Sequence, residues 1–584
     1  MPLPAVNSVL SEVEGQNKAC PEPGRRVKGR GLNTRVLIWF FPLAFLGIFF
    51  FYPLIRIFTL TLKPSLLLQA DTLHITYDAL RFTIYQAALS TILTLLLGLP
   101  SAYLFARYDF RGKSLLRALT AVPFMLPTVV VAAGFSALLG PRGWMQTLSA
   151  FFFPLSAPIP FNFIGTFSAI LTAHVFYNTT IVIRIVSNAI SRLDPKLEQA
   201  ARSLGADSRR VWWHVILPLL RPSILAASLL VFLFDFTSFG VILLLGGPGL
   251  STLEVEIYLQ SVKYFNLSLA ALLSLIQLLC TLIFSILYTR VTSAVTVQTA
   301  PRSISSNTRK PHNGRERIFV FAFYLLLITF YVLPLISIPL RSITRLEADR
   351  GQRGEVQTGL TTDYYSELFI NRRDSVFYVP PIQAARNSLL YASATIILSL
   401  ALGFPAASAL VKPTRFEKIL DPILMLPLGA SAVTLGLGFI ISYGRLLTNP
   451  ALVPLAHTLV ALPFVIRTLQ PAIASIPERL RQAAASLGAS PFRVWQTVDW
   501  QILRRATLSA ATFAFTISLG EFGATLLISR PDYPTIPVAI EKFLSQPGGL
   551  NYGQAMAMAT LLMLLTITCI LIIEKLRLPG AGEF

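Results

Sequence analysis

The stretch Gln199-Ala200-Ala201-Arg202-Ser203-Leu204-Gly205-Ala206 occurs a second time as Gln482-Ala483-Ala484-Ala485-Ser486-Leu487-Gly488-Ala489. Gly488 lies 283 positions after Gly205 (488 − 205), and the same spacing relates further residues on both sides without a gap. These matched pairs are His174 with His457, Arg184 with Arg467, Trp212 with Trp495, Arg221 with Arg504, Phe239 with Phe522, and Gly240 with Gly523. Both copies lie between strongly apolar segments. The repeat therefore predicts two equivalent halves, and a polar loop kept this similar indicates a docking surface rather than a spacer.

The composition is that of a membrane protein. Hydrophobic residues make up 54% of the chain and charged residues 13%, whereas a soluble domain carries about 25% charged residues. Mean hydropathy is +0.63, and apolar runs of ~20 residues, long enough to cross a bilayer, recur along the chain. Too little polar surface remains for a soluble enzyme. The formal net charge of +21 could indicate nucleic-acid binding. Most basic residues fall in short loops between apolar runs, however, so we expect a lipid bilayer and no nucleic acid as partner.

The apolar runs predict an all-α integral membrane protein with about twelve transmembrane helices. They cover residues 36–62, 80–106, 115–140, 163–190, 222–246, 267–290, 318–340, 385–411, 419–447, 451–475, 506–530 and 553–576. If the N-terminus is cytoplasmic and the spans alternate, the short basic loops all lie on the inner side, as the positive-inside rule requires. The C-terminus is then cytoplasmic too. Each half has an even number of spans, which predicts two parallel six-helix repeats related by an axis along the membrane normal.

Two polar segments separate the predicted units. Residues 1–32 contain Pro and Gly and are predicted to form a disordered tail. Residues 291–317 are rich in Ser, Thr, Arg and Pro and are predicted to be a flexible cytoplasmic linker. The linker joins a first transmembrane unit, residues 33–290, to a second one, residues 318–578.

The repeated loop has the pattern of two short helices with a turn between them. Ala200, Ala201 and Leu204 share one helical face, and Gly205 supplies a backbone that permits a sharp bend. Trp212, with Trp495 in the second copy, offers a large apolar anchor of the kind found at interface hot spots. An amphipathic loop lying on the lipid surface explains the residues equally well.

The loop resembles the "EAA" loop of bacterial ABC importer permeases, in which Glu-Ala-Ala is followed after three residues by Gly and after nine more by Ile-x-Leu-Pro. The first copy keeps this spacing and ends in Val215-Ile216-Leu217-Pro218, whereas the second ends in Val498-Asp499-Trp500-Gln501. Both copies have Gln in place of the acidic residue. The resemblance implies an ABC type-1 permease fold and loops that seat on ATPase subunits. The residues assigned to this coupling role are Gln199, Ala200, Ala201, Gly205, Trp212, Gln482, Ala483, Ala484, Gly488 and Trp495.

The resemblance extends over about residues 33–578 and is to permeases in which two six-helix units are fused, as in thiamine and ferric-iron importers. Short stretches such as Ala173-His174-Val175-Phe176 and Leu245-Gly246-Gly247 look most like the thiamine branch. The family implies a bacterial plasma-membrane protein that takes up a small solute by alternating access. Its implied partners are two cytoplasmic ABC ATPase subunits and an extracytoplasmic solute-binding protein.

The sequence predicts no catalytic chemistry within the chain itself. The sequence has no Gly-x4-Gly-Lys-Ser/Thr phosphate loop, so we expect ATP to be bound and hydrolysed on the partner subunits and this chain to hold no cofactor. The five histidines make no metal-ligand spacing, and we expect neither a metal site nor catalytic residues. A membrane-embedded enzyme is therefore disfavoured. A secondary transporter with parallel six-helix repeats remains the alternative function.

Two carboxylates interrupt apolar runs at corresponding places. Asp235 lies in the fifth span and Glu521 in the eleventh, three residues out of register. An intramembrane carboxylate usually faces a bundle interior or a water-filled path. One hypothesis is that both residues line or border a translocation path for a cationic solute; the other is a structural hydrogen bond or ion pair between helices. His174 and His457 are interpreted as interfacial or packing residues.

Overall fold

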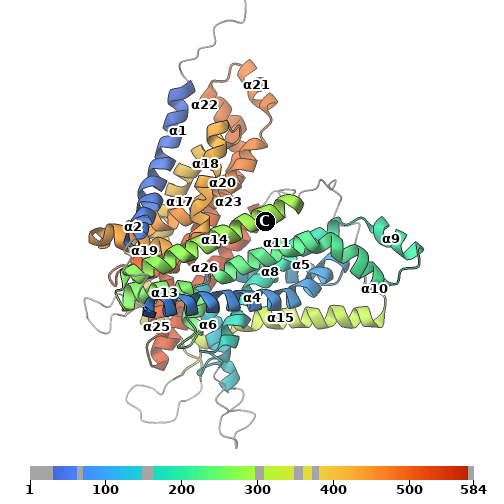
Figure 1. Ribbon diagram of the computed structural model, residues 1–584, viewed down its shortest axis with the longest axis horizontal. Coiled ribbons are helices and arrows are strands. Elements are labelled where there is room, and N and C mark those ends of the chain that lie inside the picture. Colours follow the sequence, from blue (N-terminus) through green and yellow to red (C-terminus); the bar gives the residue numbers. More distant parts are fainter. Residues whose placement is uncertain are drawn as a thin grey trace, which may run out of the picture.

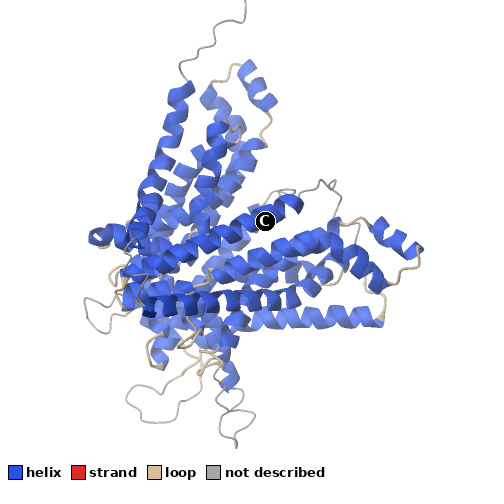
Figure 2. Ribbon diagram, in the orientation of Figure 1, coloured by secondary structure: helices blue, strands red, loops and turns tan. Residues whose placement is uncertain are grey.

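The computed structural model describes residues 31–61, 70–147, 163–295, 308–346, 359–370 and 380–576. These residues are helical apart from connecting loops (Figure 2) and two isolated β-bridges. Most of the predicted tail and residues 296–307 of the predicted linker lie outside them. The rest of that linker is ordered: residues 291–295 complete a helix, and the backbones of Arg107 and Asp109 hydrogen-bond with that of Arg309. The predicted flexible segment is therefore too long at both ends.

The first unit runs from α1 to α14. Its helices are α1 (Gly31–Leu46), η1 (Gly47–Phe51), α2 (Tyr52–Thr61), α4 (Ala70–Arg107), α5 (Lys113–Met125), α6 (Thr128–Leu139), α8 (Phe167–Arg192), α9 (Pro195–Ser203), α10 (Ser208–Val211), η2 (Trp212–Ile216), α11 (Leu217–Phe236), α12 (Gly240–Leu245), α13 (Leu253–Tyr258), η3 (Leu259–Lys263) and α14 (Leu267–Val295).

The second unit repeats this order. Its helices are α15 (Gly314–Ser342), α16 (Asp363–Ser366), η5 (Glu367–Phe369), α17 (Pro381–Leu410), α18 (Arg415–Gly429), α19 (Ala432–Tyr443), η6 (Gly444–Leu446), α20 (Leu452–Ala474), α21 (Glu478–Ser486), α22 (Pro491–Val494), η7 (Trp495–Asp499), α23 (Trp500–Gly520), α24 (Gly523–Ile528), α25 (Ile536–Leu544) and α26 (Gly549–Leu576).

Every predicted span lies on helix. Four of the spans, however, are broken helices, which corrects the predicted continuous spans. Spans three and nine bend by 109° and 94° between α5 and α6 and between α18 and α19. Spans five and eleven end at the breaks before α12 and α24. Within the described residues, nine helices are long and apolar enough to cross a membrane, or up to eleven if each bent pair counts as one span. The predicted span without such a helix contains α23, whose first two turns carry the polar residues Gln501, Arg504 and Arg505.

The first helix of each unit packs on the other unit. α1 lies against α17 and α2 against α19, whereas α15 lies against α5 and α6. Trp39 donates its indole N–H to the Glu417 carboxylate across 3.3 Å, and the Ser337 hydroxyl donates to the Gly134 carbonyl at 3.0 Å. Gly134 permits this approach, because a Cβ there would lie 2.8 Å from the Pro334 carbonyl oxygen. The exchanged helices tie the two units together.

Two arms diverge from the middle of the molecule (Figure 1). One carries α4, α5, α8 and α11, with α15 alongside; the other carries α17, α18, α20 and α23, with α1 alongside. The repeated loops lie at the far ends of these arms, as α9–α10 on one and α21–α22 on the other. The predicted docking surfaces are thus the two extremities of the molecule.

Candidate functional site in the repeated loops and the central helix breaks

The two repeated loops share one turn geometry. α9 and α21 each end in a glycine of positive φ, +84° at Gly205 and +80° at Gly488. The residue after each glycine donates its backbone N–H back into the last helical turn, from Ala206 to the Ala201 carbonyl and from Ala489 to the Ala484 carbonyl, both at 3.1 Å. This is a Schellman-type helix end, which an L side chain at the glycine position would strain. The turn predicted from the sequence is therefore present in both copies.

The most exposed apolar side chain of each loop precedes its glycine. Leu204 is 89% exposed and its repeat counterpart Leu487 is 88% exposed. Sequence reasoning assigned Leu204 to a helical face but did not name either leucine as a site residue. The signal that could have found them is that both copies of the repeat have leucine at this position. The predicted glutamines and alanines surround them: Gln199, Ala200, Gln482 and Ala483 are exposed, and Ala201 and Ala484 are half-buried.

The two repeated tryptophans differ in their surroundings. Trp212 is half-buried and packs edge-on against Tyr103 of α4, with ring centroids 5.5 Å apart. Trp495 is 39% exposed and stacks between Phe492 and Trp500 at 6.0 and 5.7 Å. Only the second loop therefore presents an aromatic stack at its surface around this position.

The loops are also held to their units by different ion pairs. Glu198 of α9 binds Arg107 at the end of α4 at 2.7 Å. At the position equivalent to Glu198 the second loop has Arg481, which binds Asp499 at 2.8 Å. Asp499 is one of the residues at which the second copy departs from the family pattern, and this ion pair gives the departure a structural role.

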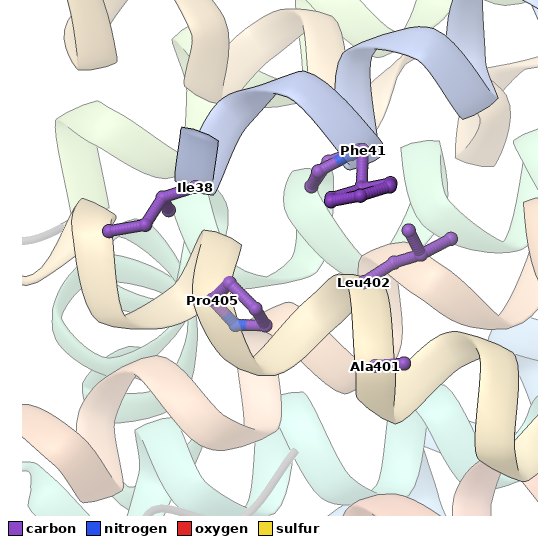
Figure 3. A pocket seen from close by; sticks show the side chains of 6 residues that line it. Ile38, Phe41, Ala401, Leu402 and Pro405 are labelled. Atoms are coloured by element: carbon purple, nitrogen blue, oxygen red, sulfur yellow. The ribbon is translucent and has the colours of Figure 1, made fainter. Parts of the chain in front are cut away.

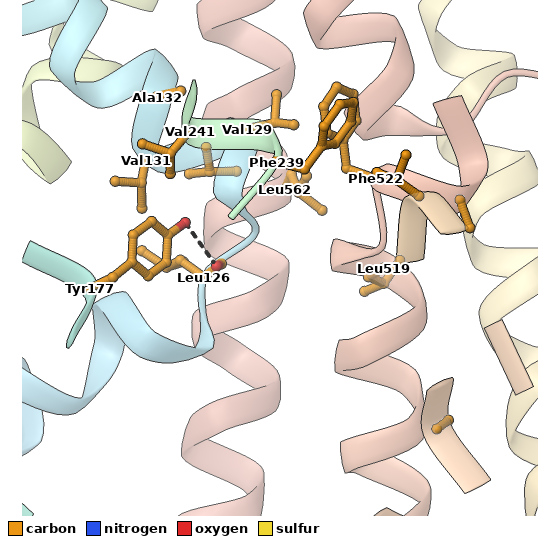
Figure 4. Packing of buried hydrophobic residues seen from close by; sticks show 14 of the residues in the cluster. Leu126, Val129, Val131, Ala132, Tyr177, Phe239, Val241, Leu519, Phe522 and Leu562 are labelled. Carbon is orange, nitrogen blue, oxygen red and sulfur yellow. Dashed lines mark hydrogen bonds between the residues drawn. The ribbon is translucent and has the colours of Figure 1, made fainter. Parts of the chain in front are cut away.

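The two units meet at a pair of repeat-related aromatic residues. Phe239 and Phe522 each follow a broken helix, and their rings stack with centroids 5.6 Å apart (Figure 4). The glycines that follow make this possible: a Cβ on Gly240 would lie 2.5 Å from the Thr128 hydroxyl oxygen and 3.2 Å from the Phe522 ring. Because equivalent residues of two related units touch only at or near the axis relating them, this stack marks the molecular pseudo-twofold axis.

Beside the first break lies a buried polar cluster around His174, which is 2% exposed. Its Nδ1 lies 3.4 Å from an Asp235 carboxylate oxygen, and its Nε2 lies 2.9 Å from the Ser238 hydroxyl. Asn178 donates its amide N–H to the same Asp235 oxygen at 2.7 Å. The Ser90 hydroxyl lies 3.1 Å from His174 Nδ1.

The second break has a matching cluster around His457, which is 1% exposed. Its Nδ1 lies 2.7 Å from the Ser518 hydroxyl, and its Nε2 lies 3.2 Å from a Glu521 carboxylate oxygen. The backbone N–H groups of Ala524 and Thr525, at the start of α24, donate to the Glu521 carboxylate at 2.8 and 2.9 Å. The carboxylate therefore caps that helix as well as binding the histidine.

Both predicted path residues are consequently buried. Asp235 is 0% exposed and Glu521 is 8% exposed, and each lies within 3.4 Å of a histidine from the neighbouring helix of its own unit. They lie next to the breaks that carry Phe239 and Phe522, so they border the contact between the units. The histidines, interpreted from the sequence as packing or interfacial residues, are the centres of these clusters.

Other surfaces offer less chemistry. A shallow pocket between α1 and α17 is lined by apolar residues, among them Ile38, Phe41, Leu402 and Pro405 (Figure 3), and has no side chain to orient a polar solute. Among the residues that the structure describes, no group of three or more His, Cys, Asp or Glu side chains could hold a metal ion.

The chain is similar to known membrane transport proteins. Residues 94–297 match the family described as "Binding-protein-dependent transport system inner membrane component". The "Thiamine transport system permease protein ThiP" of Brucella abortus (strain 2308) is 28% identical over 502 residues, covering 85% of this chain and 87% of that protein. The protein of the same name from Escherichia coli (strain K12) is 26% identical over 512 residues, covering 86% and 89%.

Among solved structures, a bacterial alginate ABC transporter in complex with a periplasmic protein covers 46% of this chain and 98% of its own, at 16% identity and a TM-score of 0.37. That likeness is too low to bear on the assignment, which comes from the sequence relatives. The family model matches much of the first unit and thiamine permeases align across both units, so the chain is similar to fused, two-unit thiamine transport permeases.

Proposed function

We propose that this permease imports a small cationic solute under the control of two cytoplasmic ATPase subunits, one seated on each repeated loop. The observation that carries the proposal is the pair of almost fully exposed leucines, Leu204 and Leu487, on turns of the same geometry at the ends of the two arms. A leucine exposed to this extent next to exposed small residues suits insertion into a groove on another protein. ATP is bound by those partners and not by this chain.

The solute that we propose is thiamine, delivered to the outer face by an extracytoplasmic binding protein. The names of the relatives support this choice, and thiamine is a cation with aromatic rings. Such a molecule can pass an aromatic pair favourably, because a cation over a ring face is attracted to it. Ferric iron is the other solute that the family suggests.

The transport step that we propose is alternating access around the stack of Phe239 and Phe522. The stack closes the seam between the units, and separation of the two helix breaks opens it. Asp235 and Glu521 border this path and favour a cation there. In this proposal the repeated loops, the short basic loops and both termini lie on the cytoplasmic side of a bacterial inner membrane, the orientation that the positive-inside rule favours.

The coupling role is tested with Leu204→Ser and Leu487→Ser. Loss of a buried leucine contact removes about 1.5–3 kcal/mol of binding free energy, so each variant should retain less ATPase on co-purification and the double variant should retain least. Leu360→Ser is the matched control, because Leu360 is 79% exposed and lies between α15 and α16, outside both repeated loops. A double variant that holds as much ATPase as the control contradicts the docking role.

The energy source and the solute are tested with radiolabelled thiamine in proteoliposomes containing the permease, its ATPase and the binding protein. We expect uptake that needs internal ATP and survives ionophores that dissipate proton and sodium gradients. Uptake that needs a gradient and not ATP would identify a secondary transporter. Accumulation of ferric iron in the same proteoliposomes, with no accumulation of thiamine, would assign the other solute.

A further inference from the structure

The two buried clusters are related by an exchange of chemical groups. With the spacing of 283 residues, Ser518 occupies the position of Asp235 (518 − 235), and Glu521 occupies the position of Ser238 (521 − 238). The first unit therefore has its acid at the earlier position and its hydroxyl at the later one. In the second unit the order is reversed.

The exchange is also present in the geometry around the histidines. In both units Nδ1 faces the earlier position, 3.4 Å from Asp235 or 2.7 Å from Ser518. In both units Nε2 faces the later position, 2.9 Å from Ser238 or 3.2 Å from Glu521. The imidazole rings thus have the same orientation. Each has one carboxylate neighbour and a second hydroxyl besides the one at the exchanged position: Ser90 lies 3.1 Å from His174 Nδ1, and the Thr525 hydroxyl lies 2.7 Å from His457 Nε2.

Each cluster fastens a helix break to the interior of its own unit. Asp235 is in the last turn of α11, and its backbone carbonyl accepts a hydrogen bond from Gln86 of α4 at 2.7 Å. Glu521 connects His457 of α20 to the first turn of α24. The next residue after each later position is an aromatic of the central stack, Phe239 after Ser238 and Phe522 after Glu521. The clusters therefore set where the two rings lie.

We propose that the two clusters are one positioning device used twice. In each cluster a single carboxylate beside the histidine holds the helix break that carries Phe239 or Phe522. Either of two positions one turn apart can supply this carboxylate. One acid is required because its loss leaves the buried Asn178 amide, or the backbone N–H groups of Ala524 and Thr525, without an acceptor. Two acids beside one buried histidine would repel each other. This inference rests on the proposed function in one respect only, because the proposed function assigns the stack to the solute path.

The supporting donors differ between the two positions. A carboxylate at the later position can bind the unpaired backbone N–H groups at the start of the next helix, as Glu521 does. A carboxylate at the earlier position relies on Asn178, whose repeat counterpart is Ala461. Moving the acid forward in the first unit should therefore be tolerated. Moving it back in the second unit should additionally require Ala461→Asn.

The test measures the distance between the breaks with Phe239→Cys and Phe522→Cys together, in a chain whose Cys20, Cys280 and Cys569 are replaced by alanine. A short bifunctional thiol reagent is applied to the purified chain in lipid, and the cross-linked fraction is compared among variants. Asp235→Ser should lower it by about threefold or more, because a hydrogen-bonded buried acid is lost. Asp235→Ser with Ser238→Glu should restore it to within about twofold of the parent.

The second unit provides the reciprocal test. Glu521→Ser should lower cross-linking, Ser518→Asp added to it should restore little, and Ala461→Asn added to both should restore most. If Asp235→Ser yields no folded protein, Asp235→Asn takes its place. Two results overturn the proposal. In the first, variants with the acid moved to the other position cross-link as poorly as the single variants. In the second, the single variants cross-link like the parent. Cross-linking needs neither solute nor ATP, so a wrong solute assignment leaves this outcome unaffected.

Discussion

At the scale of single residues, the strongest constraint lies at the two loop glycines. Gly205 and Gly488 have positive φ, and a Cβ on either would meet no atom within 4 Å. A substitution there therefore acts through the backbone and leaves the surrounding packing intact. The turn itself sets the angle between α9 and α10, and between α21 and α22, and hence how the exposed leucines are presented.

We expect Gly205→Val and Gly488→Val to weaken ATPase association, since a β-branched residue at positive φ costs about 1–3 kcal/mol. Gly249→Val is the matched control: Gly249 has φ +82° and equally open surroundings, but lies outside the loops. The measurement is co-purification of the ATPase together with solute-stimulated ATP hydrolysis. Equal losses in the control and the loop variants would show that the strain acts on folding rather than on docking.

The intramembrane carboxylates also belong to the residue scale. Asp235→Asn and Glu521→Gln keep the size and the hydrogen-bond acceptor of the side chain but remove its charge. We expect solute uptake to fall by about tenfold, because a charged hydrogen-bond partner contributes about 1.5–3 kcal/mol, while the amount of inserted protein changes little. Asn178→Ala is the comparison, because it removes the hydrogen bond to Asp235 while the carboxylate itself is kept. Normal uptake in both neutral variants would leave these carboxylates with a structural role only.

Whole elements explain why the second loop departs from the family pattern. α21 is held by the ion pair of Arg481 and Asp499, whereas α9 is held by Glu198 and Arg107. Transplanting the first loop into the second puts Glu at position 481 and Ile at position 499. The new carboxylate would lie one turn from Glu478, whose side chain binds Lys412 at 3.2 Å.

From this we predict that Asp499→Ile alone destabilises the second loop by about 1 kcal/mol and lowers the coupling of ATP hydrolysis to uptake. Adding Arg481→Glu should recover part of the loss, because Lys412 at the end of α17 can then bind the new carboxylate. Uptake per ATP hydrolysed is the quantity to measure, with thermal unfolding as the control for folding. A single variant with unchanged coupling would mean that the loop needs no such tether.

Helices were predictable from the sequence and their breaks were not. Apolar runs and basic loops place all twelve predicted spans on helix. The stretches Met125-Leu126-Pro127 and Met425-Leu426-Pro427 look alike, but the breaks near them fall at different places: the first bend is at Leu126–Pro127, whereas α18 continues through Pro427 to Gly429 before the second bend. A proline limits where a helix can begin, but tertiary packing decides where it ends.

The polar clusters could be predicted only in part from the sequence. The fixed repeat spacing pairs Asp235 with Ser518 and Ser238 with Glu521, and this exchange was visible as two acids three residues out of register. Nothing in the sequence indicated that His174 and His457 face them, because a contact between two helices depends on their rotation and depth. The docking role of the loops came from a family resemblance and remains a prediction.

At the scale of the whole molecule, the exchange of first helices means that the units defined along the sequence are not independent folding units. α1 and α2 cover α17 and α19 of the second unit, and α15 covers α5 and α6 of the first. A unit expressed alone would expose the apolar surface that its partner's first helix covers. Polar groups of this contact, such as the Gly134 carbonyl that accepts from Ser337, would lose their partners.

We therefore expect a chain divided between residues 300 and 301 to give two halves that are unstable alone and associate when made together. Loss of the exchanged helices removes burial of many apolar side chains, each contributing about 1.5–3 kcal/mol, which exceeds the stability of a typical domain. The measurement is the yield and monodispersity of each half, made singly and together, with the intact chain as reference. The control removes residues 1–61 from the first half, which should weaken association because α1 and α2 are then missing and only α15 remains as an exchanged helix. Two halves that are each stable and monodisperse alone would show that the exchanged helices contribute little, and that the contact around Phe239 and Phe522 suffices to join the units.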